Sequence, residues 1–246
     1  MTGVALVTGG AGGIGGAVVA RLAADGWTVT SFDRAAGASH TVDVTSDAAV
    51  GAGVAAVLAT HGRIDLLVTA AGVTTGRPLH ETDPAGWHAV LDANLTSVYL
   101  CARHVLPAMV AAGSGVIVTI GSVLARTTAP GLPAYAAAKG AVVALTRQLA
   151  VDYGRHGIRC VTISPGWIRT PATESRLDDA ERQREATPGA TRLGEPADVA
   201  AAVAYAAGAP FLTGTEIVLD GGASAVSPAS LLRPGPRAAL GLPPLG

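Results

Sequence analysis

Short runs of β-branched and other apolar residues alternate along the chain with longer, alanine-rich stretches. The runs are continuously apolar, which is typical of strands covered by helices on both faces. They predict strands at residues 4–8, 27–32, 64–70, 115–120, 158–164 and 215–220, with a shorter strand at 40–44. The stretches between them predict helices at residues 13–24, 46–60, 84–112, 134–155 and 196–207.

This alternation predicts an α/β fold, a doubly wound, Rossmann-type parallel sheet of about seven strands with helices on both faces. We expect a single domain over residues 1–224, because no linker interrupts the pattern. Residues 225–246 carry five prolines and no strand-like run. We expect them to form a tail that is either disordered or packed on a neighbouring subunit.

Composition narrows the function classes. The 246 residues are 49% hydrophobic, which supplies a sizeable core and excludes a disordered protein. A formal net charge of -1 gives no general attraction to nucleic acid or to anionic membranes. The sequence shows neither a secretory signal nor a long apolar run, so we expect a cytoplasmic protein without membrane or nucleic-acid partners. Cys101, Cys160 and the six histidines lack ligand spacing, so no metal site is expected.

A glycine cluster, TGGAGGIGG, lies between the first predicted strand and the first predicted helix. Gly9, Gly13 and Gly15 would let the backbone turn tightly and approach a pyrophosphate, to which the helix N-terminus offers free amides. Asp33 ends the second predicted strand, where a carboxylate can accept both ribose hydroxyls of an adenosine. It would also repel a 2′-phosphate, so NAD is favoured over NADP. Two alternatives stay open: Asp33 only caps a turn, or Arg34 reaches a phosphate.

The segment PAYAAAKGAV places Tyr135 and Lys139 four positions apart on one face of an apolar helix. A cation within about 4 to 6 Å favours the phenolate form of a tyrosine. The pair is therefore predicted to act as a general acid/base. Ser122 follows the predicted strand 115–120, at the sheet edge where ligands bind in open parallel sheets. Its hydroxyl could donate to the substrate oxygen that Tyr135 protonates or deprotonates.

Together these motifs resemble the short-chain dehydrogenase/reductase superfamily from Val4 to about Gly222. The family pattern TGxxxGxG is met by Thr8, Gly9, Gly13 and Gly15, YxxxK by Tyr135 and Lys139, the active-site serine by Ser122, and the fourth-helix asparagine by Asn94. The resemblance implies that Tyr135 is the acid/base and that Lys139 favours its ionised form and holds the nicotinamide ribose. It also implies that Ser122 positions the substrate oxygen and that Asn94 supports a proton-relaying water.

The resemblance also implies a set of cofactor-binding residues around the sheet edge. SPGWIRT is similar to the family's PGxIxT, VDV to its adenine-binding segment, and TAAG stands where the family has NNAG. Thr69 and Ala70 thus replace two asparagines, a departure that affects local detail at the cofactor. The implied cofactor-binding residues are Gly9, Gly12, Gly13, Ile14, Gly15, Asp33, Asp43, Val44, Ala70, Ala71, Gly72, Tyr135, Lys139, Pro165, Ile168 and Thr170.

By the same analogy, Val123, Leu124, Leu132, Trp167 and residues 171–191 would line the substrate pocket. Their apolar members favour an uncharged ring alcohol, so we expect an NAD-dependent oxidoreductase acting on a secondary alcohol. Two alternatives remain: an NADPH-type ketoreductase acting on acyl-carrier or polyketide substrates, and a dinucleotide sensor without turnover. Arg176, Arg182 and Arg184 are expected to form a solvated face, and Trp87 and Trp27 to be core residues. The family resemblance and the apolar circumference of helix 134–155 imply a homotetramer or homodimer.

Overall fold

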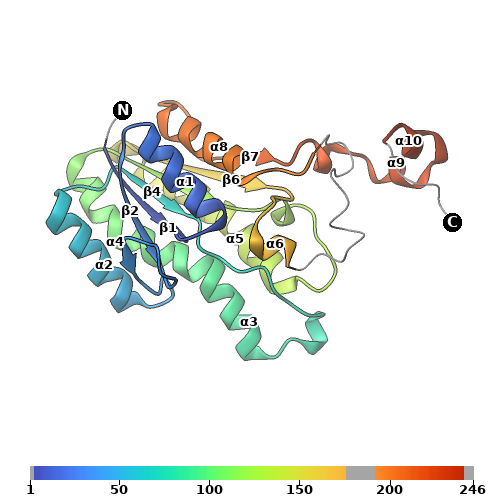
Figure 1. Ribbon diagram of the computed structural model, residues 1–246, viewed down its shortest axis with the longest axis horizontal. Coiled ribbons are helices and arrows are strands. Elements are labelled where there is room, and N and C mark those ends of the chain that lie inside the picture. The colour runs from blue at the N-terminus through green and yellow to red at the C-terminus, as the bar shows by residue number, and fades with distance from the viewer. Residues whose placement is uncertain (1–2, 176–191, 241–246) are drawn as a thin grey trace.

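Seven parallel strands form one sheet in the computed structural model, which describes residues 3–175 and 192–240 (Figure 1). The strand order is β3-β2-β1-β4-β5-β6-β7, so the chain runs outward from β1 in one direction and then from β4 in the other. The strands are β1 (Val4–Thr8), β2 (Thr28–Asp33), β3 (His40–Thr41), β4 (Leu66–Thr69), β5 (Gly115–Ile120), β6 (Ile158–Pro165) and β7 (Thr215–Leu219). The predicted fold class is confirmed.

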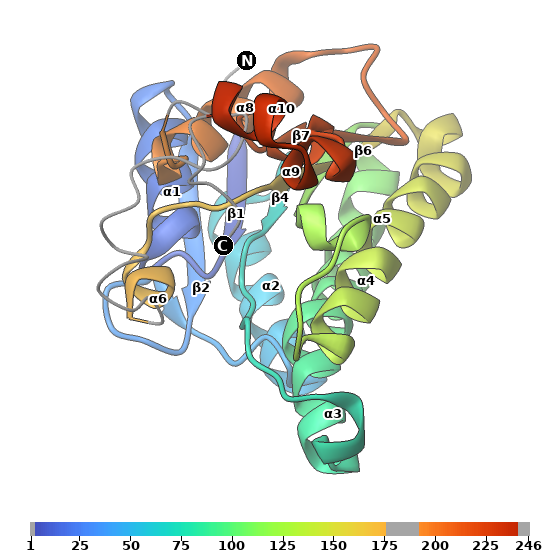
Figure 2. The ribbon, with the colours of Figure 1, turned by 90° about the vertical axis from the view of Figure 1, so that its right-hand side faces the viewer.

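Helices cover both faces of the sheet (Figure 2). On one face, α1 (Gly13–Ala24) and α8 (Pro196–Gly208) pack through residues such as Leu22 and Val203, both fully buried. On the other face lie α2 (Asp47–His61), α4 (Ser97–Ala112) and α5 (Pro133–Tyr153). The continuously apolar strands predicted this arrangement, because each strand has to bury both of its faces.

Helix boundaries follow from local sequence. The Ser46 hydroxyl accepts a hydrogen bond from the Ala49 amide at 3.3 Å and begins α2, while Gly62 ends it at a φ of 73°. Pro196 stands at the start of α8, where the Glu195 amide donates to the Asp198 carboxylate at 2.8 Å. These caps satisfy backbone groups that have no partner within the helix.

The helix predicted at residues 84–112 is present, with a wider turn within it. It consists of α3 (Pro84–Leu91), a π-helical turn, η2 (Asp92–Thr96), and α4. The Asn94 amide nitrogen donates to the carbonyl of Val90 at 2.9 Å and also to that of Val73 at 2.9 Å. This side chain competes with the helix ladder for the Val90 carbonyl, which is how a polar residue inserts one wider turn. Hydrophobic periodicity could not indicate this, because the apolar pattern continues across the turn.

The whole stretch Pro84–Ala112 is apolar and long enough to cross a membrane by length and composition. Within its most apolar window, 44% of the residues are buried inside the protein, and α4 packs against α2 and the sheet. The buried core helix of a soluble protein passes the same test of length and composition, so this finding is weak evidence for a membrane segment.

The predicted strand at 40–44 is shorter than expected. It ends at Thr41, because the Asp43 carboxylate accepts hydrogen bonds from both the amide and the hydroxyl of Thr45 and turns the chain. Beyond β7, the structure describes two short helices, α9 (Pro228–Leu232) and α10 (Pro234–Ala239), which project away from the sheet (Figure 1). The division into a domain and a tail stays a prediction.

Candidate active site

The glycine turn after β1 is held against the segment that follows β4. Gly9 has a φ of 70°, and a Cβ there would lie 2.9 Å from the Cα of Ala71. A Cβ on Gly15 would overlap the carbonyl oxygen of Gly9. Beside Gly12, by contrast, a Cβ would meet no atom within 4 Å. The turn is therefore closed on the protein side and open on the other, a shape that admits a pyrophosphate at the start of α1.

Asp33 lies at the end of β2, directly against this turn. One carboxylate oxygen accepts a hydrogen bond from the Ala11 amide at 3.1 Å, and the other accepts one from the Ala35 amide at 3.0 Å. Asp33 thus caps a turn, as one alternative held, and it also places its negative charge beside the glycine turn. A carboxylate in this position suits an adenosine ribose, so the residues present fit a dinucleotide.

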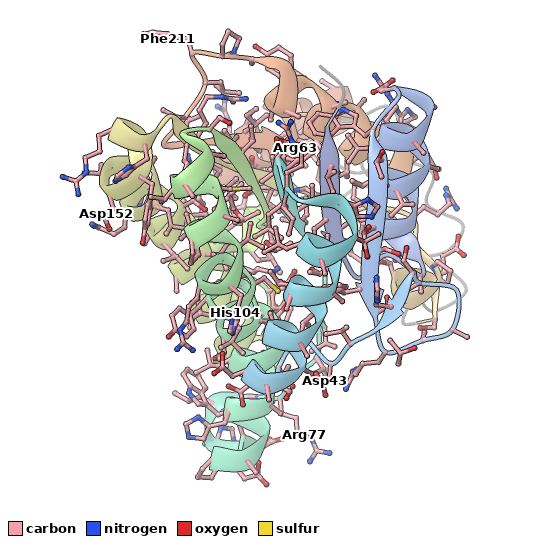
Figure 3. The ribbon with its side chains drawn as sticks, turned by 90° about the vertical axis from the view of Figure 1, so that its left-hand side faces the viewer. Asp43, Arg63, Arg77, His104, Asp152 and Phe211 are labelled. Atoms are coloured by element: carbon pink, nitrogen blue, oxygen red, sulfur yellow. The ribbon has the colours of Figure 1, made fainter. Side chains whose placement is uncertain are left out.

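Asp43 and Val44 follow on the chain segment that leads into α2, and Asp43 is labelled in Figure 3. Hydrogen bonds from Thr45 are the main cause that lowers the pKa of Asp43. Val44 is only partly buried and packs against the core on the α2 side. Both residues lie close in sequence to Val42, whose amide continues the pairing with the Asp33 carbonyl at 2.9 Å.

The TAAG segment replaces the two asparagines with groups that make fewer hydrogen bonds. Thr69, Thr8 and Thr119 face one another in register across β4, β1 and β5. The Thr8 hydroxyl accepts from the Ala71 amide at 3.1 Å. Among the described residues, the Thr69 hydroxyl is the buried side-chain polar atom that lacks a partner. Ala70 packs partly against the core on the α1 side, and its carbonyl carbon would lie 3.0 Å from a Cβ on Gly9.

Lys139 is buried on α5 and its ammonium points at the end of β5. The Nζ atom donates to the carbonyl of Ile120 at 2.9 Å and lies 5.7 Å from the centroid of the Tyr135 ring. Burial lowers the pKa of Lys139 to about 8. The ammonium is therefore still mainly protonated at pH 7, so it supplies a positive charge beside the phenol.

Tyr135 is 9% exposed and belongs to a small apolar cluster separate from the two cores of the sheet. We call this set the tyrosine cluster: Trp87, Val90, Leu124, Leu132, Ala134 and Tyr135. Leu124 and Leu132 were expected near the substrate, and the structure places both against the tyrosine. Trp87 was expected to be a core residue, and it is a partly buried side chain packed on the apolar core of this cluster.

Ser122 begins the one-turn helix η3 (Val123–Ala125), and its hydroxyl oxygen accepts from the Leu124 amide at 3.2 Å. That bond leaves the hydroxyl proton free to be donated elsewhere. Because Leu124 packs in the tyrosine cluster and Ile120 binds Lys139, the end of β5 carries the serine into the same region as both residues of α5.

Asn94 is fully buried, and its side chain is fixed by three hydrogen bonds: two donated to carbonyls and one accepted from the Val73 amide at 3.2 Å. Gly72 lies between it and the lysine, since a Cβ on Gly72 would be 2.6 Å from the Asn94 carbonyl oxygen and 3.7 Å from the Lys139 Nζ atom. Glycine is therefore required where TAAG passes these two side chains. The structure brings Asn94, Lys139 and Gly72 together, as the resemblance implied.

The segment after β6 lies across the glycine turn. Pro165 ends β6 and is buried, and Thr170 begins α6 (Pro171–Glu174), with its methyl group 3.6 Å from where a Cβ on Gly13 would lie. Ile168 is 5% exposed and pairs with Gly194, so it packs in the core on the α1 side. Residues 176–191, which belong to the segment expected to line the substrate pocket, lie outside the described residues. They include Arg176, Arg182 and Arg184.

Trp167 was expected to line the substrate pocket, and that role stays a prediction. The side chain is 45% exposed and lines a hollow of about 160 Å³ with Arg192, Asp198 and Asp220. Around it, the Gly166 amide donates to the Leu219 carbonyl, and the Gly194 amide donates to the Trp167 carbonyl. Trp27, in contrast, packs partly against the core, as predicted.

Sequence reasoning missed several groups that shape the site. The Ile120 and Val73 carbonyls act through the backbone, so no side-chain motif reveals them. The π-helical turn around Asn94 carried no pattern of its own. Glu216 was visible as one acidic residue inside an otherwise apolar strand, a signal that could have been used.

Comparisons with known proteins agree with this geometry. A family model described as enoyl-(acyl carrier protein) reductase matches residues 9–224. A cis-4-hydroxycyclohexanecarboxylate dehydrogenase of Sinomonas cyclohexanicum is 38% identical over 91% of this chain and 97% of its own length. A cyclopentanol dehydrogenase of Comamonas sp. is 37% identical over 90% and 97%. The solved structure of Thermoplasma acidophilum aldohexose dehydrogenase has a TM-score of 0.85 at 30% identity, covering 92% of this chain and 96% of that one.

The glycine turn generates one prediction. Gly15→Ala should lower the free energy of unfolding by about 1 to 3 kcal/mol, because its methyl group overlaps the Gly9 carbonyl. Gly12→Ala, which adds the same methyl group in open space, is the matched control and should change unfolding by less than about 0.5 kcal/mol. Urea unfolding of both variants measures the difference, and equal stabilities would contradict the close packing of the turn.

The buried lysine generates a second prediction. Its pKa is about 8 in the folded protein and 10.5 when unfolded, so between these values the unfolded chain binds more protons and stability rises with pH. Lys139→Met has no such contribution. The unfolding free energy of the unaltered protein, relative to that of this variant, should therefore rise by about 2 to 4 kcal/mol from pH 7 to pH 10.5. Unfolding both proteins at several pH values measures it; a constant difference would show that the ammonium is not desolvated.

Proposed function

The chain belongs to the short-chain dehydrogenase/reductase superfamily, and we propose that within it the protein is an NAD-dependent dehydrogenase of secondary alcohols. The observation that carries the proposal is the buried Lys139 ammonium, 5.7 Å from the centre of the Tyr135 ring. The cation lies beside a phenolic group that can exchange a proton with the hydroxyl of an alcohol.

The residues divide the reaction between them. Tyr135 takes the hydroxyl proton of the alcohol on its phenolic oxygen, and Lys139 supplies a positive charge beside the ring during this transfer. Ser122 donates its free proton to the substrate oxygen and holds it in place. A nicotinamide dinucleotide held at the glycine turn would supply the acceptor for the hydride of the carbinol carbon, so that the alcohol would become a ketone. Run in reverse, the same groups reduce a ketone.

We further propose that the alcohol is carried on a ring. The described side chains packed around Tyr135 are apolar and include the Trp87 indole, Leu124 and Leu132, a surface that suits the flat hydrocarbon face of a ring. The relatives from Sinomonas and Comamonas are named for hydroxycyclohexanecarboxylate and cyclopentanol. Both names describe a secondary hydroxyl on a saturated ring.

For the cofactor, Asp33 supports NAD rather than NADP. Its carboxylate stands beside the glycine turn, where a 2′-phosphate would meet a like charge. The neighbouring Arg34 is exposed and interacts electrostatically with Asp43. No lysine or arginine lies between Gly9 and Gly15 to offset the Asp33 charge.

The first test compares turnover of ring alcohols by the unaltered enzyme and Tyr135→Phe. With cyclohexanol, cyclopentanol and an open-chain secondary alcohol, formation of reduced nicotinamide should be fastest on a ring substrate. Tyr135→Phe should lower kcat by about 10²- to 10⁴-fold, the usual contribution of general acid–base catalysis. Tyr153→Phe, at the far end of α5, is the matched control and should keep the activity. Absence of turnover across alcohols and ketones, with dinucleotide still bound, would favour the sensor alternative.

The second test concerns cofactor choice. The ratio of kcat/KM with NAD to that with NADP should be on the order of a hundredfold, because the Asp33 charge opposes the extra phosphate. Asp33→Ser should reduce the ratio at least about tenfold by removing that repulsion. Asp25→Ser, at the exposed end of α1, should leave it unchanged. A preference for NADP by the unaltered enzyme would instead favour the ketoreductase alternative.

A further inference from the structure

A buried carboxylate on the last strand is bonded to two segments of the active site. The Glu216 side chain on β7 is only 2% exposed. One of its oxygens accepts from the Arg126 guanidinium, with Nε at 2.6 Å, and the other accepts from the Ser164 hydroxyl at 2.6 Å. Burying a carboxylate is costly unless it is paired, so these contacts are what allows it to lie under the sheet edge.

Arg126 ends the same one-turn helix that Ser122 begins. The Ala125 amide donates to the Ser122 carbonyl at 3.0 Å, and the Arg126 and Thr127 amides both donate to the Val123 carbonyl. These hydrogen bonds make residues 122–127 one compact turn. A single 3₁₀ turn has little stability of its own, so its position depends on the packing of Leu124 in the tyrosine cluster and on what holds its two ends.

The two ends are held differently. At the first end, the Gly121 amide donates to the Ile163 carbonyl at 2.7 Å, and a Cβ on Gly121 would lie 2.5 Å from the Ser164 hydroxyl oxygen. At the second end, the Arg126 side chain reaches Glu216, after which residues 127 and 128 are exposed. Ser164 also directly precedes Pro165, where the segment across the glycine turn begins. Glu216 thus connects the serine turn to the segment that borders the cofactor.

We propose that Glu216 is a positioning residue for the reaction: through Arg126 and Ser164 it holds the Ser122 turn in register with the segment Pro165–Thr170. Its effect on turnover rests on the proposed function, whereas its effect on the turn does not. A shift of about 1 Å in a positioned group can cost about a hundredfold in rate, so loss of this connection should appear in kcat. Ordinary exposed ion pairs contribute little to stability and have no such effect.

The chain offers a matched control in Asp65. Its carboxylate likewise pairs with an arginine, Arg63, and accepts a further hydrogen bond, from the Val4 amide at 2.8 Å. Asp65 directly precedes β4, so it lies at the amino ends of the strands, whereas the site lies at their carboxyl ends. Figure 3 labels Arg63 and Asp43 at opposite ends of α2. Asp65→Asn and Glu216→Gln therefore remove comparable charges, one remote from the site and one beside it.

Glu216→Gln should lower kcat about 10- to 100-fold on the best alcohol and leave the dissociation constant of the dinucleotide nearly unchanged. Asp65→Asn should leave kcat nearly unchanged even if it lowers the melting temperature as much. Adding Arg126→Met to Glu216→Gln should cause little further loss of kcat, because the two residues act as one unit. An unchanged kcat in Glu216→Gln would overturn the proposal, and so would equal losses of kcat in Glu216→Gln and Asp65→Asn.

Amide hydrogen exchange of the cofactor-free protein tests the same proposal without activity. Exchange in a peptide spanning residues 122–128 should be at least about tenfold faster in Glu216→Gln than in the unaltered protein or Asp65→Asn. Unchanged exchange would overturn the positioning role even if kcat fell. If the unaltered protein oxidised no alcohol while exchange rose as expected, the proposed function would fail and the positioning of the turn would stand.

Discussion

The burial of one ammonium group is the constraint on which the site depends. Lys139 lies inside the protein, where burial disfavours its charge, and it is held there by a hydrogen bond to the Ile120 carbonyl. That bond joins the start of α5 to the end of β5, so it also fixes where Ser122 follows the strand. The small residues of α5 and the bare backbone of Gly72 leave room for the group. The molecule gives up some stability to keep a positive charge beside the tyrosine.

Around this charge, the parallel sheet brings together segments that are far apart in the chain. The glycine turn, the TAAG segment, the serine turn and the stretch after β6 all follow the carboxyl ends of neighbouring strands. These segments approach one another closely where a glycine has no side chain: Gly9 against Ala71, Gly13 against Thr170, and Gly121 against Ser164. The site is thereby built on closely packed backbone at the carboxyl ends of the strands. Asp33 lies there beside the glycine turn, and Lys139 lies beside the end of β5.

How much the sequence reveals depends on the kind of interaction. Strands and helices were predictable because their apolar patterns report burial, and the motif residues were predictable because chemistry limits which residue types can serve. The π-helical turn at Asn94 was not, since it involves hydrogen bonds from one side chain to the carbonyls of Val90 and Val73, which no apolar pattern records. The exact surroundings of Trp87 and Trp167 were not predictable either. An indole suits a core, a pocket or a surface hollow equally well, and only the course of the backbone decides among them.

The link between Arg126 and Glu216 also orders events during synthesis. These residues are 90 positions apart, and within the described residues β7 is the last strand to be synthesised. A nascent chain can present the glycine turn, the tyrosine and the lysine long before β7 has been made. Its serine turn still lacks one anchor until the final strand joins the sheet edge. Addition of β7 to the sheet and completion of the serine turn are therefore the same step, so a chain that stops before Glu216 lacks this anchor.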